Sequence, residues 1–224
     1  MKKQKSCLSN KNRKKVAKYM KEDLRVIKTK ENIKKSMLHL LKKYAFKDIT
    51  MSMLVDECRI NKTTFYRHYS DKYDLIEKIS KDYISLFSKA SSNFVNGINV
   101  HNIDCLIQFF DDNKDELLIL ESKILPINIF EDMHAIMTLD LCTYFKKSIN
   151  QDDLIKLYAS LISNNILTTI KWYHKNYLNF ERNQIIQIVL QTVETGLEQS
   201  ITAIMKGQKM CTDDKSSGVG KVAP

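Results

Sequence analysis

The stretch 60–69, INKTTFYRHY, concentrates side chains that donate hydrogen bonds on a segment short enough to be a single helix. A helix packed on a core needs only Phe65 and Tyr69, four residues apart, to hold one face inward. The other positions carry two threonines, a second tyrosine, a lysine, an arginine and a histidine. Such a surplus of donors suits phosphate oxygens and the edges of bases. The stretch therefore predicts a surface that contacts DNA.

Two short helices with a tight turn between them would position these side chains. Thr50 can cap the first helix, and residues 59–61 form a break. The second helix begins at Asn61 or Lys62 and continues through Tyr69. This arrangement is typical of a helix-turn-helix, whose second helix fits the width of the major groove.

A third helix is predicted before this pair, because apolar residues recur at three- and four-residue steps from Thr29 onward. The stripe consists of Ile33, Met37, Leu40, Leu41 and Tyr44. Residues 1–27 are basic and only weakly patterned, so we expect a flexible or partly helical arm there.

The rest of the chain is also predicted to be helical. A long helix starts at Lys72 after a cap at Ser70 or Asp71, and Gly97 ends it. Further helices are expected at 101–111, 114–121, 131–148, 152–176 and 181–206, with a break at Pro126. The last two have apolar stripes wider than one face, which predicts burial on two sides. Four small residues, Ala159, Ser163, Gly196 and Ser200, would let a second copy approach.

The composition places the chain in the all-α class. Five glycines and two prolines among 224 residues are too few turn-forming residues for a β fold with many turns. The expected domains are the arm at 1–27, a three-helix head at 28–72, and a ligand-binding and dimerisation domain at 73–206. A disordered tail is expected at 207–224, where Lys, Ser, Gly and Asp predominate.

The charge is unevenly divided along the sequence. Residues 1–80 hold 22 Lys and Arg against 9 Asp and Glu, whereas the remainder holds 14 against 17. A basic head on a slightly acidic body indicates a module that faces a polyanion, joined to something else. The alternative, a lysine-rich proteome, would affect both halves.

Several function classes find no support in the sequence. The five scattered cysteines form no C-x-x-C, so neither a disulfide framework nor a metal site is predicted. No nucleophile–base pair or Gly-rich phosphate loop occurs, so we predict no enzyme and no cofactor. The basic start lacks a following apolar run, and no stretch of 18 apolar residues occurs. We therefore expect a cytoplasmic, nucleoid-associated protein without a membrane partner.

The run from about Lys28 to Ile79 resembles the tetracycline-repressor (TetR/AcrR) family of bacterial regulators. The likeness rests on YAFKDIT, then MSMLVDECRI, then NKTTFYRHYSDKYDL, in that order. The resemblance implies an all-helical homodimer with an N-terminal DNA-binding head. It also implies that the helix from Lys72 links the head to a ligand-binding core, and that the last two helices form the dimer's four-helix bundle.

Individual residues match the contact positions of that family. By this resemblance the DNA-contacting residues are Thr50, Lys62, Thr63, Thr64, Tyr66, Arg67, His68 and Lys72. Thr50 and Lys72 would bind phosphates, Tyr66 the DNA backbone, and Arg67 the bases. One position departs from the family: its usual turn glycine is Arg59 here. A positive φ at Arg59 would cost on the order of 1 kcal/mol.

The expected function is that of a sequence-specific, homodimeric repressor that binds an inverted-repeat operator and is released by a small ligand. Aromatic, methionine and histidine side chains of the C-terminal part could line the ligand cavity, although ordinary core packing explains most of them. The candidates are Met133, Met137, Tyr144, Trp172 and Tyr173, with His134, Phe145 and His174 beside them. The alternative is a regulator or activator whose C-terminal domain binds a protein partner instead of a small molecule.

Overall fold

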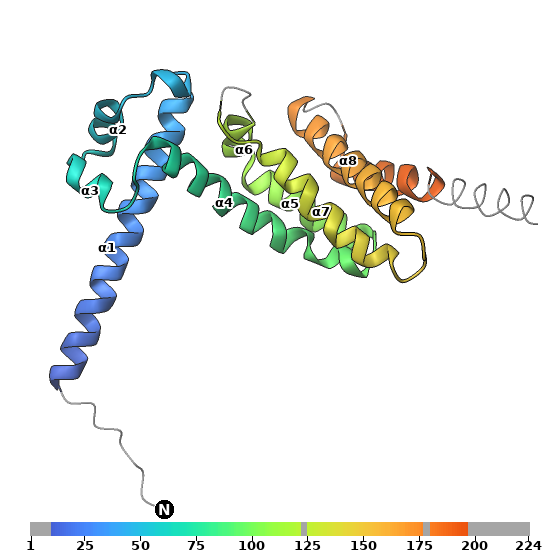
Figure 1. Cartoon of the computed structure of the whole chain (residues 1–224), viewed down its shortest axis with the longest axis horizontal. Helices are drawn as coiled ribbons and strands as arrows, with labels where there is room; N and C mark the ends of the chain where they lie inside the picture. The colour runs from blue at the N-terminus through green and yellow to red at the C-terminus, as the bar shows by residue number, and fades with distance from the viewer. Residues whose placement is uncertain (1–9, 122–124, 177–179, 197–224) are drawn as a thin grey trace, which may run out of the picture. The chain divides into compact units, whose positions relative to one another are not determined.

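The computed structural model describes the backbone of residues 10–121, 125–176 and 180–196, and side chains from Leu24 onward within those ranges. Every element in those ranges is a helix, which confirms the all-α fold class (Figure 1). The predicted tail and the end of the last predicted helix lie outside the described residues. No described helix combines the length and apolar character needed to cross a bilayer.

The chain divides into two compact units. The first, which we call the head, comprises residues 1–83 and 118–128, and the second comprises 84–117 and 129–224. The long helix α4, Lys72–Ser91, therefore contributes residues to both units.

The head begins with α1, Asn10–Leu41, which starts far earlier than the predicted helix at Thr29. The predicted start at Thr29 is therefore wrong, and of the two expectations for the arm at 1–27 the partly helical one agrees with the structure. Periodicity missed the earlier part because lysines and arginines interrupt the apolar stripe there, although both are good helix formers.

After α1 come the 3₁₀ helix η1, Phe46–Asp48, then α2, Met51–Cys58, and α3, Lys62–Tyr66. The α1 stripe is confirmed at Ile33, Met37 and Leu40, which are buried. Tyr44 lies beyond the end of α1 and is 47% exposed, so it does not belong to that stripe.

The second unit is a set of helices around an apolar core. After α4 the chain forms η2, Ser92–Asn96, then α5, Val100–Asp112, and α6, Lys114–Leu120. The next elements are α7, Ile129–Phe145, and α8, Asp152–Asn176, followed by a helical segment over 182–196. Helix α7 packs along α8 and against η2, and α5 also packs against α8.

Both predicted breaks are present, although the long helix predicted to run from Lys72 to Gly97 is regular only as far as Ser91 and continues as η2. Gly97 ends η2 with φ 128° and ψ 176°, a conformation that suits glycine almost alone. A side chain at Gly97 would also meet the ring of Tyr144 at 3.3 Å. Pro126 lies between α6 and α7, where no helix is formed. Helix α8 begins and ends at the residues that the sequence predicted.

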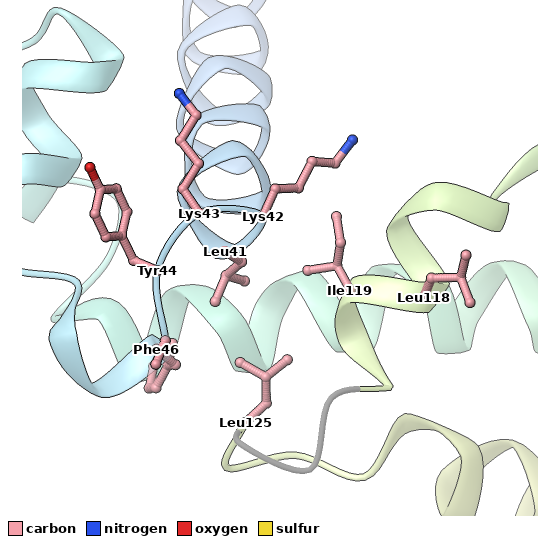
Figure 2. Close-up of a pocket in the computed structure, with 9 residues that line it drawn as sticks. Leu41, Lys42, Lys43, Tyr44, Phe46, Leu118, Ile119 and Leu125 are labelled. Carbon is pink, nitrogen blue, oxygen red and sulfur yellow. The ribbon is translucent and has the colours of Figure 1, made fainter.

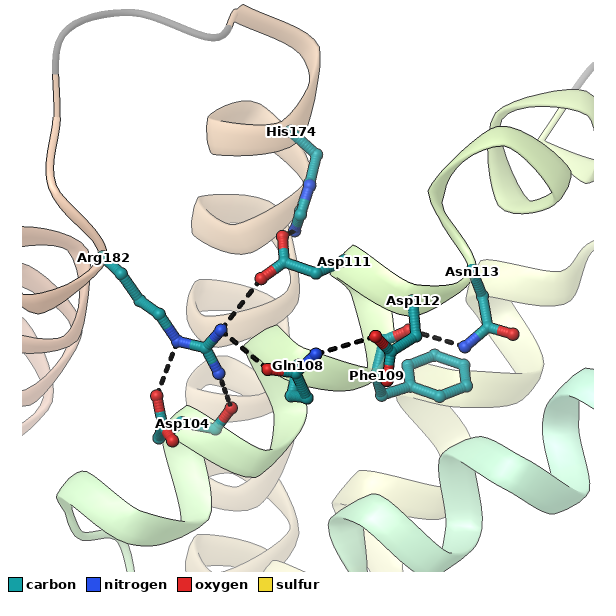
Figure 3. A network of polar contacts seen from close by, with 8 residues as sticks. All are labelled: Asp104, Gln108, Phe109, Asp111, Asp112, Asn113, His174 and Arg182. Atoms are coloured by element: carbon teal, nitrogen blue, oxygen red, sulfur yellow. Dashed lines mark hydrogen bonds and ion pairs between the residues drawn. The ribbon is translucent and has the colours of Figure 1, made fainter.

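A polar network joins α5 to the helical segment 182–196 in the second unit (Figure 3). The Arg182 guanidinium donates to Asp104 Oδ1 at 2.6 Å and to the Asp104 carbonyl at 2.7 Å. It also donates to Gln108 Oε1 and Asp111 Oδ2, each at 3.0 Å. One arginine thus fixes the start of that segment against three residues of α5.

Candidate nucleic-acid interface

Helices α2 and α3 are each capped by a side chain at their first turn. Thr50 Oγ1 accepts from the Met53 amide at 3.2 Å, which confirms the predicted cap of α2. Asn61 Oδ1 accepts from the Thr64 amide at 2.7 Å and so fixes the start of α3. A side chain that satisfies an otherwise unpaired amide at a helix start sets where that helix begins.

The turn between the two helices depends on a left-handed residue. Arg59 has φ 52° and ψ 44°, which confirms the positive φ expected at this position. The Ile60 amide then reaches the Val55 carbonyl at 3.1 Å, a common way to close a helix C-terminus. The Asn32 side chain donates to the Cys58 carbonyl at 2.7 Å and ties the same turn to α1.

Helix α3 presents one buried and one exposed face. Phe65 and Tyr69 are buried, with ring centroids 5.6 Å apart, as predicted. The outward side chains are the exposed Lys62, Thr63, Tyr66 and Arg67, with Thr64 and His68 half-buried. Four of the six predicted contact residues in this stretch are thus exposed and two are half-buried, so all six are at least partly accessible.

The helix is shorter than predicted. It ends at Tyr66, so Arg67, His68 and Tyr69 do not belong to the regular helix. The Arg67 and Tyr69 amides still bond the carbonyls of Thr63 and Phe65. The donors after Tyr66 therefore stay close to the helical register although they lie on a turn.

Two cations on this surface have no ion-pair partner among the described side chains. Neither Lys62 nor Arg67 forms an ion pair with any residue that the structure describes. Partial burial, followed by the charges of Lys30 and Arg67, holds the pKa of His68 below its usual range. The lowered pKa favours the neutral imidazole, which can both donate and accept a hydrogen bond.

Lys72 differs from the other predicted contact residues because its ammonium points into the protein. Its Nζ donates to the carbonyls of Phe46 and Ile49, each at 2.8 Å, and of Lys47 at 3.1 Å. The predicted phosphate contact of Lys72 stays a prediction, and the geometry favours another role.

The predicted ligand-binding residues are dispersed through the second unit. Met133 and Met137 are fully buried in its core. Tyr144 packs against Gly97, whereas Trp172 is 47% exposed and meets Phe180 at 6.2 Å. Tyr173 is half-buried beside His174. Their role in ligand binding stays a prediction.

The other histidines and the aromatic residue named with them also have partners within the protein. His134 Nε2 lies 3.1 Å from the Ser160 carbonyl. His174 is stacked on Phe110 at 5.9 Å, and Phe145 is buried. Within the described ranges no three His, Cys, Asp or Glu side chains come close enough to hold a metal ion.

One pocket of about 380 Å³ lies within the head (Figure 2). Leu41, Ile119 and Leu125 point toward its interior, whereas the ammonium groups of Lys42 and Lys43 point away. A second, open groove of about 250 Å³ runs between α8 and the segment 182–196. None of the five predicted ligand residues lines either of these two.

The helix-turn-helix geometry has a counterpart among known families. Residues 37–79 match the family described as "Bacterial regulatory proteins, tetR family". Residues 37–79 are therefore a TetR-family regulatory segment. The match covers α2, α3 and the first part of α4, so the exposed donors described above lie inside the TetR-family DNA-binding region.

Solved structures extend the likeness to most of the chain. A TetR transcriptional regulator from Streptococcus agalactiae 2603V shares 18% identity with a TM-score of 0.57, over 78% of this chain and 98% of that one. Two gamma-butyrolactone receptor structures (ArpA-like protein) give TM-scores of 0.44. Their identities are 18% and 15%, over 79% and 76% of this chain and 99% of each receptor. The first likeness shows the fold. Curated proteins give no match.

Several supports of the TetR-family head were not foreseen from the sequence. Asn32 bonds a backbone carbonyl 26 residues away, and Lys72 bonds carbonyls 26 and 23 residues away. Asn61, in contrast, was recognisable, since asparagine directly before a helix is a frequent cap.

Proposed function

We propose that this TetR-family regulator binds specific DNA sequences by laying α3 in the major groove. The observation that supports this proposal is that α3 has one buried face and one face of exposed hydrogen-bond donors. Lys62 and Arg67, which pair with none of the described residues, favour a polyanion as the partner. By the same proposal the protein acts on DNA in the cytoplasm and is not an enzyme.

The individual roles follow from position. Lys62 and Thr64 at the first turn of α3, together with Tyr66 and Thr50, are proposed to bind the DNA backbone. Thr63 and Arg67 are better placed for base edges, with His68 next to them as a neutral group. Arginine can form two parallel hydrogen bonds to guanine, which makes Arg67 the main candidate for reading sequence.

A selection from random DNA tests this proposal. The wild type is expected to enrich an inverted repeat with half-sites spaced by about one helical turn or a little more. Arg67→Ala should relax the preference at one or two positions of each half-site, by roughly 1–3 kcal/mol. Lys146→Ala, which removes an exposed cation of the second unit, is the matched control and should leave the preference unchanged. Failure of the wild type to enrich any sequence would refute the proposed function.

We also propose that the protein is a homodimer joined through α8 and the segment 182–196. Leu157 and Leu161 on α8 and Ile188 on the segment are 52%, 56% and 41% exposed, although the other face of each helix is buried. Gly196 is exposed, and a Cβ there would meet nothing within 4 Å. Apolar side chains exposed beside an open groove favour association with a second copy.

Two of the small residues expected at that interface face inward instead. Ala159 and Ser163 are fully buried, and Thr138 Oγ1 donates to Ser163 Oγ at 3.2 Å. The expectation that they admit a second copy is therefore wrong, while Ser200 lies outside the described residues.

Light scattering should give about twice the 26.2 kDa chain mass. Leu161→Asp should lower that mass, whereas Val100→Asp, at an equally exposed site on α5, should not.

The regulatory mode that we propose is repression relieved by a small ligand bound in the second unit. The breaks at Gly97 and Pro126 support it, because they interrupt the regular packing of long helices. The competing mode is binding of a protein partner, which the 68% exposed Leu139 on α7 favours. A thermal-shift screen of small molecules, followed by a promoter reporter, separates the two modes and fixes the sign of regulation.

A further inference from the structure

The ammonium of Lys72 is enclosed by the backbone between α1 and α2. It donates to the carbonyls of Phe46, Lys47 and Ile49 at 2.8, 3.1 and 2.8 Å. An ammonium carries three hydrogens and accepts none, so these three bonds use its full donor capacity.

Two aromatic rings complete the environment of this ammonium. The centroid of Phe46 lies 4.9 Å from Nζ and that of Tyr73 lies 5.7 Å away. The two rings meet edge to face at 5.1 Å, and Phe46 is almost fully buried. Ring faces at this distance attract a cation, so the site holds Lys72 by both charge and hydrogen bonding.

The three carbonyls belong to the short helix η1 and to the residue that follows it. A helix leaves its last carbonyls without partners inside the helix, and here Lys72 donates to those of Lys47 and Ile49. It also adds a second donor to the Phe46 carbonyl, which already accepts from the Ile49 amide. Thr50, the cap of α2, comes directly after Ile49. A residue at the start of α4 therefore fixes the backbone from which α2 departs.

We propose that Lys72 is a positioning residue for DNA binding, whose ammonium clamps the turn 46–49 to the start of α4. The segment 51–66, which contains α2 and α3, begins just after the turn that Lys72 binds and ends shortly before Lys72 itself. One side chain therefore joins the backbone on the two sides of this segment. The inference rests on the proposed DNA binding, and it replaces a phosphate contact by Lys72 with an intramolecular one. Moving Nζ to a phosphate would leave the three carbonyls without this donor, which opposes that alternative.

Salt dependence separates the two roles. A lysine bound to phosphate releases counterions, so its loss lowers the salt slope of binding by about 0.9 per contact. A clamp that only shapes the protein contributes no such slope. Lys72→Met should weaken DNA binding by on the order of tenfold at every salt concentration, with the slope of the wild type. Lys62→Met, on the exposed face of α3, should instead reduce the slope.

A charge-preserving variant gives a second decision. Arginine binds phosphate at least as well as lysine, but its planar fork does not fit three carbonyls converging on one point. Lys72→Arg should therefore remain as weak as Lys72→Met. Recovery of binding in Lys72→Arg, or a reduced salt slope in Lys72→Met, would overturn the clamp. If Lys72→Met does not fold, Lys72→Arg alone decides.

Hydrogen exchange on the DNA-free full chain tests the clamp independently of DNA binding. The amides of Asp48 and Ile49 bond the carbonyls of Ala45 and Phe46 inside this turn. Their exchange should speed up in Lys72→Met and stay unchanged in Lys62→Met. Unchanged exchange in Lys72→Met overturns the inference. If exchange speeds up in Lys72→Met as expected but the wild type selects no DNA sequence, the proposed function is refuted and the clamp is not.

Discussion

Two arginines show how differently the two units of this chain use positive charge. Arg67, after the end of α3, is exposed and pairs with no residue that the structure describes. Arg182, in the second unit, donates to Asp104, Gln108 and Asp111. The same side chain is thus free for an outside partner in the head and is a structural link in the second unit.

The difference indicates where binding and where stability are concentrated. An unpaired surface cation contributes little to folding, so the head can present several without a large loss of stability. Lys72 shows that position in the head alone does not decide the matter, since its ammonium bonds three carbonyls. The partners of each charge, rather than its place in the sequence, separate the two uses.

Arg182→Ala should give the largest change in stability among the charge variants. It removes four hydrogen bonds, two of them to carboxylates, on a side chain that is 30% exposed. We expect a loss of about 2 kcal/mol in the free energy of unfolding, measured in urea. Arg67→Ala should change it by less than about 0.5 kcal/mol. A similar loss for both arginines would remove the contrast between the units.

Acid should destabilise the second unit through His174. Burial, with Lys114 and Arg182 nearby, holds the pKa of His174 below its usual range, although Asp111 opposes the shift. Its Nε2 lies 3.6 Å from Asp111 and makes no hydrogen bond to a described residue. This distance is too long for a hydrogen bond, and the burial that lowers the pKa favours the neutral ring.

The direction of the pH effect follows from this lowered pKa. The unfolded chain binds the proton more tightly, so stability is complete above the ordinary histidine pKa of about 6.5 and falls as the pH drops below it. Urea unfolding at pH 7.5 and 5.5 should show a smaller loss for His174→Phe than for the wild type. Equal losses would mean that His174 is not responsible.

Lys62→Gln should affect binding without affecting folding. It removes an exposed cation at the first turn of α3, so the salt slope of DNA binding should fall by about one unit per half-site. Titrations of a selected operator at several salt concentrations measure this change. Lys146→Gln in the second unit is the control, and an equal change there would show that overall charge is responsible.

The smallest expected effect is a gain in stability from Arg59→Gly. Glycine adopts the left-handed conformation of Arg59 without steric cost, but it also loses more entropy on folding. The balance should be about 0.5 kcal/mol in favour of the variant, with DNA affinity unchanged. A loss of stability would show that the Arg59 side chain makes a contribution of its own.

Much of this fold follows from the spacing of apolar residues. The bounds of α8, the breaks at Gly97 and Pro126, and the inward faces of Phe65 and Tyr69 were all predictable. Each depends on residues within a few positions of one another, where periodicity and local conformational preference are informative.

Other features depend on partners distant in the sequence. The bonds from Lys72 to Phe46 and from Asn32 to Cys58 each span 26 residues, which no local pattern reveals. The same reason explains why Met133 and Met137 could be recognised as apolar but not assigned to a core or a cavity. Their full burial became evident only with the neighbouring helices in place.

The shortness of α3 limits how much information one copy of the protein can extract from DNA. Five helical residues rise about 7.5 Å, which spans roughly two to three base pairs at about 3.4 Å each. A given sequence of three base pairs recurs by chance about every 64 positions. This is far too often to distinguish one site among the roughly 10⁶ or more competing sites of a genome. Recognition of a single locus therefore requires that several such short sequences be bound at the same time, at a fixed spacing.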